Sequence, residues 1–303
     1  MTKYNTRFAP SPNGYLHLGH AFSAKISEGI ARNSSGKFFL RIEDIDTGRC
    51  NKEFEKNIHD DLSWLGIKYQ SAVIRQSDRF KDYEIYIKKL RDLDLIYPCW
   101  ATRSEIKKEI KKKLTKTPKW PIDPDGQYIY PGVYKNISKA KMANLMLSGL
   151  DFSWRLNIEK ALIYAEEKYG DKIYFYERGL EPLGKRMIEP ALYGDFIIGR
   201  KEIPTSYHLS VTVDDAEQNI NLVTRGVDLY AATSIHRLLQ VILNLPQTEW
   251  YHHELIREEN RIKLSKTNIE DNPPVETAIS IFLFLIFEFK LLENFILSIF
   301  GRV

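Results

Sequence analysis

Apolar residues in the first 97 positions alternate between short continuous runs and a helical spacing. The runs at 6–9 and 38–42 have the length of buried strands, and the first stops at Pro10. Apolar positions spaced for one helix face favour helices over residues 21–31, 54–65 and 83–93. Strands that alternate with helices in this way predict a parallel sheet covered by helices, which is the arrangement of an α/β protein.

The pattern changes between residues 98 and 190. Lysine is dense over 107–116, the residues at 120–126 are typical of a loop, and strand character resumes at 153–156. This stretch therefore predicts an insertion rather than a continuation of the same sheet.

The alternation returns after residue 190. Strands are predicted over 195–198 and 207–213, a strand that runs into a loop over 222–228, and a helix over 235–245. The pattern divides the chain into a first half-sheet, an insertion, a second half-sheet and a C-terminal part, at 1–97, 98–190, 191–245 and 246–303.

Composition limits the class of protein and its partners. The 303 residues are 43% hydrophobic and 28% charged, which is typical of a soluble globular protein. The formal net charge is only +4, so an RNA contact would need a local patch. The lysines of 107–116 fit such a patch, and a solvated helix face fits them at least as well. Two cysteines, Cys50 and Cys99, suit a reducing cytosol.

No targeting or membrane-spanning segment is predicted. The first six residues lack the apolar core of a signal peptide. The most apolar run, 279–287, is broken by Ser280 and followed by Glu288 and Lys290, so it is too short to span a bilayer. We expect a cytoplasmic monomer without membrane contact.

The segment after the first predicted strand carries candidate chemistry. It reads RFAPSPNGYLHLGH over residues 7–20. A proline-rich turn that leads from a strand into a helix N-terminus makes an anion site, because the first helical amides are unpaired and the dipole is positive there. His17 and His20 are three positions apart and share one face, so both can donate to phosphate oxygens. Gly19 has no side chain, so a planar base can approach the backbone there.

This segment resembles the glutamyl-tRNA synthetase family, which includes glutaminyl and glutamyl-queuosine relatives. The glutaminyl enzymes carry Pro-Pro-Glu-Pro in the turn, whereas the Ala-Pro-Ser-Pro at 9–12 is the form that uses glutamate. The resemblance implies a class I aminoacyl-tRNA synthetase, with a Rossmann-type parallel sheet split by a stem-contact-like insertion and a short helical C-terminal part. It also implies that ATP, with Mg²⁺, is bound by His17, Gly19 and His20.

The resemblance assigns a glutamate pocket. Guanidinium groups bind carboxylates bidentately, and Arg7 and Arg225 match the two arginines of the family. Which arginine takes which carboxylate stays open. Glu43 matches the acid that meets the amino group, Ser11 matches a small polar contact, and Tyr207 matches the phenol that hydrogen-bonds the substrate. The resemblance also places Phe8, Ala9 and Pro10 in the glutamate pocket.

A second signature, Lys-Leu-Ser-Lys-Thr at 263–267, resembles the mobile Lys-Met-Ser-Lys-Ser loop of class I synthetases. Its two lysines, Lys263 and Lys266, can neutralise the charge that builds on leaving pyrophosphate when a glutamate oxygen attacks the α-phosphorus in line. We expect both lysines to be catalytic and Lys266 to bind ATP.

The length of the chain after this loop bears on the acceptor. Only 36 of the 303 residues follow Thr267, whereas full-length glutamyl-tRNA synthetases continue into a large anticodon-binding region. This resembles the paralogue that activates glutamate without tRNA and then esterifies it to queuosine in the anticodon of tRNA(Asp). The expected partners are L-glutamate, ATP and tRNA(Asp).

Three alternatives remain open. The chain could be a truncated glutamyl-tRNA synthetase that charges the 3′ adenosine of a tRNA, or a degenerate RNA-binding homologue without catalysis. A more distant alternative is an unrelated Rossmann nucleotidyltransferase that shares the His-x-Gly-His motif. The unusually apolar segment 278–303 is consistent with a buried terminal helix, a frameshifted reading frame, or a membrane or partner contact.

The zinc site that is frequent in this family is eroded in the insertion. The family pattern is Cys-x-Cys followed by Tyr-x₃-Cys, but only Cys99 and Tyr130 remain, with Ala101 and Tyr134 in place of the other thiols. One thiolate and one phenol do not make a tetrahedral zinc site. The sequence therefore predicts no zinc, and an insertion held by apolar packing around Trp100, Tyr130 and Tyr134.

Overall fold

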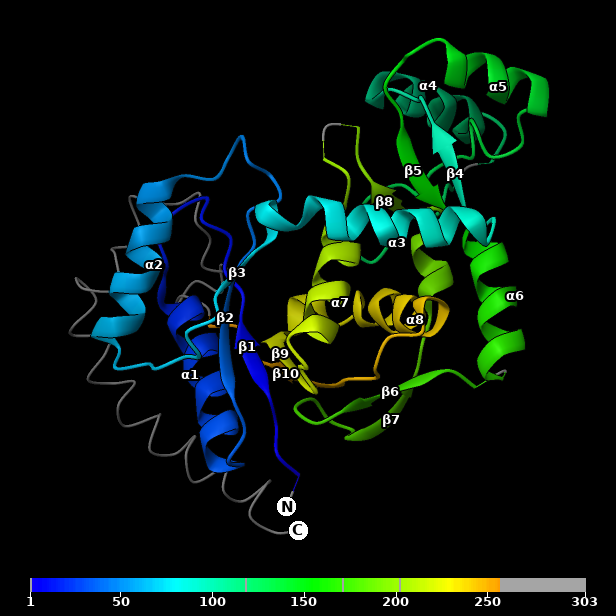
Figure 1. Ribbon diagram of the computed structural model, residues 1–303. Helices are drawn as coiled ribbons and strands as arrows, with labels where there is room; N and C mark the ends of the chain where they lie inside the picture. Colours follow the sequence, from blue (N-terminus) through cyan, green and yellow to red (C-terminus); the bar gives the residue numbers. More distant parts are fainter. Residues whose placement is uncertain (1, 118, 171, 202, 257–303) are drawn as a thin grey trace.

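The computed structural model describes residues 2–117, 119–170, 172–201 and 203–256 (Figure 1). The predicted α/β class is confirmed. In chain order the elements are β1 (Thr6–Phe8), α1 (Leu18–Asn33), β2 (Phe38–Ile42), α2 (Lys52–Trp64), β3 (Ile74–Arg75), η1 (Gln76–Arg79), α3 (Phe80–Asp92), β4 (Ile96–Cys99), α4 (Arg103–Leu114), α5 (Lys139–Leu147), β5 (Ser153–Leu156), α6 (Ile158–Tyr169), β6 (Tyr174–Glu177), β7 (Gly184–Met187), η2 (Pro190–Tyr193), β8 (Ile197–Gly199), α7 (Tyr207–Glu217), β9 (Leu222–Gly226), η3 (Val227–Leu229), α8 (Thr233–Leu243) and β10 (Glu249–His253). The short C-terminal helical part predicted after 246 lies largely outside the described residues.

Two parallel strand groups form the central layer. β1 pairs with β2 and β2 with β3, while β10 pairs with both β9 and β6, all in parallel; β7 is antiparallel to β6. β1 lies beside β9, where the amides of Asn221 and Leu222 donate to the Asn5 carbonyl at 3.2 and 3.3 Å. The ends of β1, β2 and β9 therefore meet at one edge, and open α/β sheets bind ligands at the carboxyl ends of their strands.

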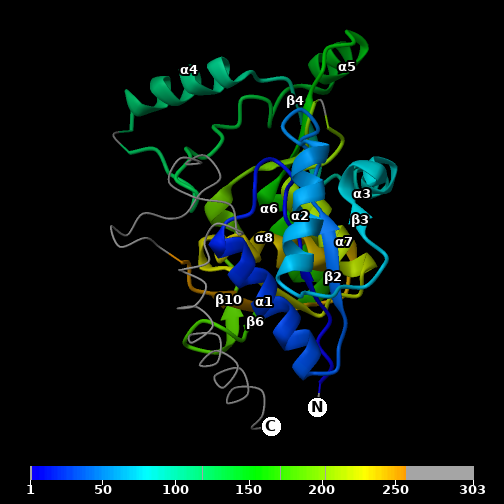
Figure 2. The same cartoon turned by 90° about the vertical axis from the view of Figure 1, so that its left-hand side faces the viewer.

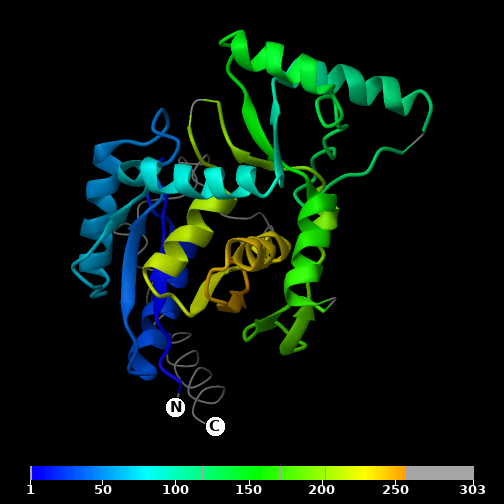
Figure 3. The same ribbon diagram turned by 45° about the vertical axis from the view of Figure 1, so that its right-hand side comes forward.

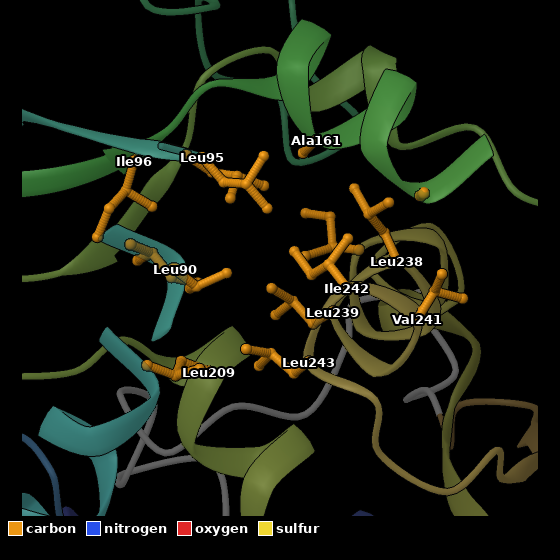
Figure 4. Packing of buried hydrophobic residues seen from close by; sticks show 14 of the residues in the cluster. Leu90, Leu95, Ile96, Ala161, Leu209, Leu238, Leu239, Val241, Ile242 and Leu243 are labelled. Carbon is orange, nitrogen blue, oxygen red and sulfur yellow. The ribbon is translucent and has the colours of Figure 1, made fainter. Parts of the chain in front are cut away.

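Helices cover this layer. Figure 2 views the molecule from the side of α1 and α2, and α1 packs Ile26 and Ile30 against Leu222 of β9. The largest apolar core lies among α3, α6, α7 and α8, where Leu90, Leu209 and the leucines of α8 are buried together (Figure 4). Within the described part, none of the helices combines the length and apolar character needed to cross a bilayer.

The insertion forms a separate antiparallel sheet of β4, β5 and β8, from which α4 and α5 project away from the central layer (Figure 3). Its predicted packing is present: Tyr130 is buried with Cys99, and the rings of Trp100 and Tyr134 lie 5.6 Å apart. Strand pairing crosses the 190/191 division, because β6 joins the central layer and β8 joins the insertion. The subdivision into sequence ranges stays a prediction.

The strand predicted over 207–213 is wrong. These residues begin the helix α7, with the side chain of Ser206 accepting a hydrogen bond from the amide of Leu209 at its N-terminus. Every residue from Leu209 to Asp215 is buried, so the segment shows no polar face and its helical period is hidden. Its valines and threonine then favour a strand on local preference alone.

Candidate active site

The turn between β1 and α1 fixes the chemistry of the two histidines. The amide of Gly19 donates to Nδ1 of His17 at 3.1 Å, and the amide of His17 donates to Nδ1 of His20 at 3.1 Å. Because both Nδ1 atoms accept, each neutral ring carries its proton on Nε2. A side chain at Gly19 would lie 3.1 Å from Cε1 of His17, so glycine keeps this turn open. Both histidines can therefore donate from Nε2, as a phosphate site requires.

One cavity of about 600 Å³ gathers the candidate residues at the ends of β1, β2 and β9. Its lining includes all eleven sequence-predicted site residues that fall in the described part: Arg7, Phe8, Ala9, Pro10, Ser11, His17, Gly19, His20, Glu43, Tyr207 and Arg225. Lys263 and Lys266 lie outside the described residues. The roles assigned to the eleven residues remain proposals, since their co-location alone does not test them.

Arg7 is held in the cavity wall by a shared carboxylate. Its Nε lies 2.9 Å from Oδ1 of Asp215, and Nη1 of Arg41 lies 2.7 Å from the same oxygen. Burial alone would raise the pKa of Asp215, but the two guanidinium charges lower it below its ordinary value. Asp215 is therefore ionised, and it fixes Arg7 on β1 relative to Arg41 on β2.

Glu43 lies next in this network. Its Oε1 accepts from Nη2 of Arg41 at 3.2 Å. Burial raises the pKa of Glu43, although Arg41 and Arg7 lower it. Because the pKa of this buried carboxyl group stays above its ordinary value, a further cation beside it would stabilise the ionised form. A ligand ammonium group therefore suits this corner of the cavity.

Arg225 has a different setting, because its contacts are neutral. Its Nε donates to Nε2 of His252 at 3.2 Å, its Nη1 to Nδ1 of His236 at 3.0 Å, and its Nη2 to Oγ1 of Thr233 at 2.6 Å. Across the described ranges it forms no ion pair with a carboxylate, and burial lowers its pKa. A buried guanidinium in this state favours an incoming anion.

The two histidines beside Arg225 have defined protonation. Arginine only donates, so Nδ1 of His236 accepts and its Nε2–H donates to Nδ1 of His208 at 3.1 Å. Burial, followed by the charge of Arg225, lowers the pKa of both rings, that of His208 to about 4. On the other side, Nδ1 of His252 donates to Glu177 at 2.6 Å. The chain of contacts from His208 to Glu177 therefore orients Arg225.

Sequence reasoning missed the buried partners of the predicted residues. They are Arg41, Glu177, Asp215, His236 and His252, all of which are buried. A detectable signal was a charge inside an apolar element: Arg41 interrupts the run of β2, and Asp215 closes the buried stretch of α7. The pairing itself was hidden, because Arg41 and Asp215 are 174 positions apart.

The residues of the eroded zinc motif form hydrogen bonds within a buried apolar cluster. Sγ of Cys99 donates to the hydroxyl of Tyr130 at 3.3 Å, and the amide of Tyr134 donates to the same oxygen at 3.0 Å. In the part of the chain that the structure describes, no cluster of three or more histidine, cysteine or acidic side chains could hold a metal ion. The residues at this position do not fit zinc.

Three features occur together: a split parallel sheet, a His-x-Gly-His turn at the end of β1, and a charged cavity beside that turn. They define the catalytic domain of a class I aminoacyl-tRNA synthetase, which is a ligase. The family model for the catalytic domain of class I tRNA synthetases (E and Q) matches residues 3–272. The chain belongs to this family.

Relatives in this family are of two kinds. The chain is 38% identical over 265 residues to a glutamyl-Q tRNA(Asp) synthetase from Rhodobacter capsulatus, covering 86% of this chain and 90% of the relative. It is 35% identical to a glutamate–tRNA ligase from Aquifex aeolicus, covering 88% of this chain and 52% of that protein. The chain thus spans about half the length of that glutamate–tRNA ligase.

The fold is also similar to a solved structure. A glutamate tRNA ligase from Elizabethkingia meningosepticum, in complex with its amino acid, superposes with a TM-score of 0.71 at 24% identity, over 89% of this chain and 53% of that one. At this identity the likeness shows the fold alone.

Proposed function

We propose that the protein activates L-glutamate with ATP and transfers it to queuosine in the anticodon of tRNA(Asp). The observation that carries this proposal is one cavity that holds a buried acid, two differently supported arginines and two Nε2–H histidines. The 38% identity to a glutamyl-Q tRNA(Asp) synthetase supports the acceptor. ATP and tRNA are cytoplasmic substrates, and we propose the same location for this protein, as a monomer.

Glutamate would enter with its charges matched to the cavity. Arg225, which has only neutral partners, would receive one carboxylate, and Glu43 would meet the ammonium group. Arg7 would contact the second carboxylate while Asp215 holds its guanidinium. Ser11 and Tyr207, which line the same cavity, would add polar contacts.

Activation is an in-line displacement. An oxygen of the α-carboxylate forms a bond to the α-phosphorus of ATP, the bond to the bridging oxygen breaks, and pyrophosphate leaves. Mg²⁺ that enters with ATP would neutralise part of the phosphate charge. His17 and His20 would donate to phosphate oxygens, and Lys263 and Lys266 would neutralise the leaving group. In the second step an acceptor hydroxyl attacks the glutamyl carbonyl, and AMP leaves. The protein contributes position and charge.

The test is ATP–pyrophosphate exchange with glutamate in the absence of tRNA, followed by mapping of the glutamylated nucleotide. We expect exchange without tRNA, and label at queuosine of tRNA(Asp). Exchange that strictly requires tRNA, with label at a 3′ adenosine, would instead identify a shortened glutamate–tRNA ligase. Absence of exchange under both conditions would leave the degenerate RNA-binding alternative.

A further inference from the structure

A second hollow lies between α3, the loop before β5 and the loop after β8. We call it the arm groove, because the arm formed by residues 103–150, with α4 and α5, ends beside it. It has a volume of about 400 Å³, and its lining includes Met146, Leu150, Phe152, Trp154, Arg200 and Lys201. Apolar and aromatic groups next to cationic ones are the composition of a site for unpaired nucleotides, since bases stack on the rings and phosphates meet the charges.

The aromatic side of the arm groove is rigid. The ring of Phe152 lies 5.3 Å from that of Trp100 and 5.0 Å from that of Trp154. Nε1 of Trp100 donates to the Leu150 carbonyl at 3.2 Å, which holds the loop before β5 against this cluster. A stacking surface fixed in this way loses little conformational entropy when a base binds.

Arg200 connects the arm groove to the catalytic cavity. It also lines a small hollow of about 150 Å³, which shares Ser11, Glu43 and Tyr207 with the cavity. Arg200 is exposed, and no hydrogen bond or ion pair of its side chain involves another described residue. Its guanidinium is thus available to a ligand that spans the two hollows.

The positive charge of the arm beside the groove favours RNA over a protein partner. The arm, residues 103–150 with α4 and α5, holds eleven lysines and arginines and four acids. Its formal net charge is therefore more positive than the +4 of the whole chain. A concentrated positive charge attracts a phosphate backbone. Two acids, Glu84 and Asp151, also line the groove and can accept from the exocyclic amino group of a base.

We propose that the arm groove binds the unpaired nucleotide next to the acceptor nucleotide, and that Arg200 contacts the phosphate between them. This inference rests on the proposed function, because it concerns the RNA on which that function acts. It adds a recognition site outside the catalytic cavity, one that acts on transfer and leaves glutamate activation unaffected.

The experiment compares exchange and transfer in the same proteins. The variants are Arg200→Ala and Leu150→Ser, matched by Lys168→Ala and Ile163→Ser on α6; Ile163 is exposed to 57% and Leu150 to 59%. We expect all four to keep tRNA-independent exchange, and the two groove variants to lose about tenfold or more in kcat/KM for queuosine-containing tRNA(Asp). Unchanged transfer in Arg200→Ala and Leu150→Ser would overturn the inference and would favour a protein as the ligand of the groove.

An abasic RNA gives a second test. Anticodon stem-loops that lack the base on one or the other side of the acceptor are compared with the intact stem-loop. We expect one abasic RNA to be a poor acceptor for the wild type, and Leu150→Ser to add no further loss with it. Equal transfer to all three RNAs, or loss of exchange in the groove variants, would overturn the inference. Absence of exchange in the wild type would instead refute the proposed function.

Discussion

Nη1 of Arg225 donates a hydrogen bond to Nδ1 of His236 over 3.0 Å in the buried wall of the cavity. Because a protonated His236 could not accept this bond, the charge of Arg225 requires a neutral histidine beside it. A carboxylate in the same position would cancel that charge. The neutral partner orients the guanidinium and leaves its charge for a ligand.

Removal of this partner should weaken glutamate binding. We expect His236→Ala to raise KM for glutamate in ATP–pyrophosphate exchange by roughly 10- to 100-fold, the worth of a hydrogen bond to a charged group. His236→Gln, whose side-chain oxygen can accept from Arg225, should recover part of the loss. A purely structural role for His236 would instead leave KM for glutamate unchanged in the fraction that folds.

Loss of the shared carboxylate should destabilise the domain. We expect Asp215→Asn to lower the free energy of unfolding by about 3–5 kcal/mol, because two buried guanidinium groups lose their countercharge. The matched control is Asp46→Asn, whose pair with the exposed Arg49 should be worth about 0–1 kcal/mol. Urea denaturation of both variants measures the difference, and equal values would contradict a stabilising role of Asp215.

Acidification should destabilise the protein through its buried histidines. Burial, and then Arg225 and Arg200, lower the pKa of His208 from 6.5 to about 4. Between these values the unfolded chain takes up a proton that the folded chain does not, so stability falls by up to about 1.4 kcal/mol per pH unit for this group. His236 acts in the same direction.

Urea denaturation at several pH values between 4 and 7 tests this in the wild type and in His208→Gln. Glu43 and Asp214, whose pKa values burial raises, act in the opposite sense in both proteins and cancel in the comparison. We expect the variant to show the shallower slope. A slope equal to that of the wild type would show that His208 titrates normally.

The phosphate site should depend on the two N-terminal histidines. We expect His20→Ala to lower kcat of exchange by about 10²-fold, by analogy with other preorganised donors to developing charge. His59→Ala is the control, since His59 lies outside the cavity and contacts the hydroxyl of Tyr69 at 2.7 Å. Similar kinetics for both variants would remove His20 from the proposed mechanism.

Zinc should be absent from the purified protein. Elemental analysis should find substoichiometric zinc, and EDTA should leave the free energy of unfolding unchanged, because Cys99 is engaged with Tyr130 in a buried contact. Cys99→Ser should then cost no metal affinity. One zinc per chain would contradict this interpretation of the insertion.

Several strands and helices could be predicted from the sequence, because their apolar residues form a recognisable run or spacing. The strand at 38–42 is a short continuous apolar run in which four of the five residues are buried, and the helix over 54–65 buries Ile58 and Leu62 on one face. The sequence predicts both elements correctly. The strand predicted over 207–213 is wrong because the helix is buried on every side from Leu209 to Asp215, where polar residues such as Asp215 pair inside the protein. The cavity residues could be predicted from motif matches, whereas Asp215, His236 and Glu177 act through contacts between distant segments that no local pattern reveals.

The contact of Asp215 with two arginines also bears on how the chain tolerates insertions and deletions. Asp215 follows the insertion, and its two arginine partners precede it by 208 and 174 positions. A buried carboxylate on α7, after the insertion, thus contacts β1 and β2 directly, and the arm takes no part in this contact. Lengthening, shortening or exchanging the arm should therefore alter which RNA is accepted while the glutamate chemistry continues unchanged.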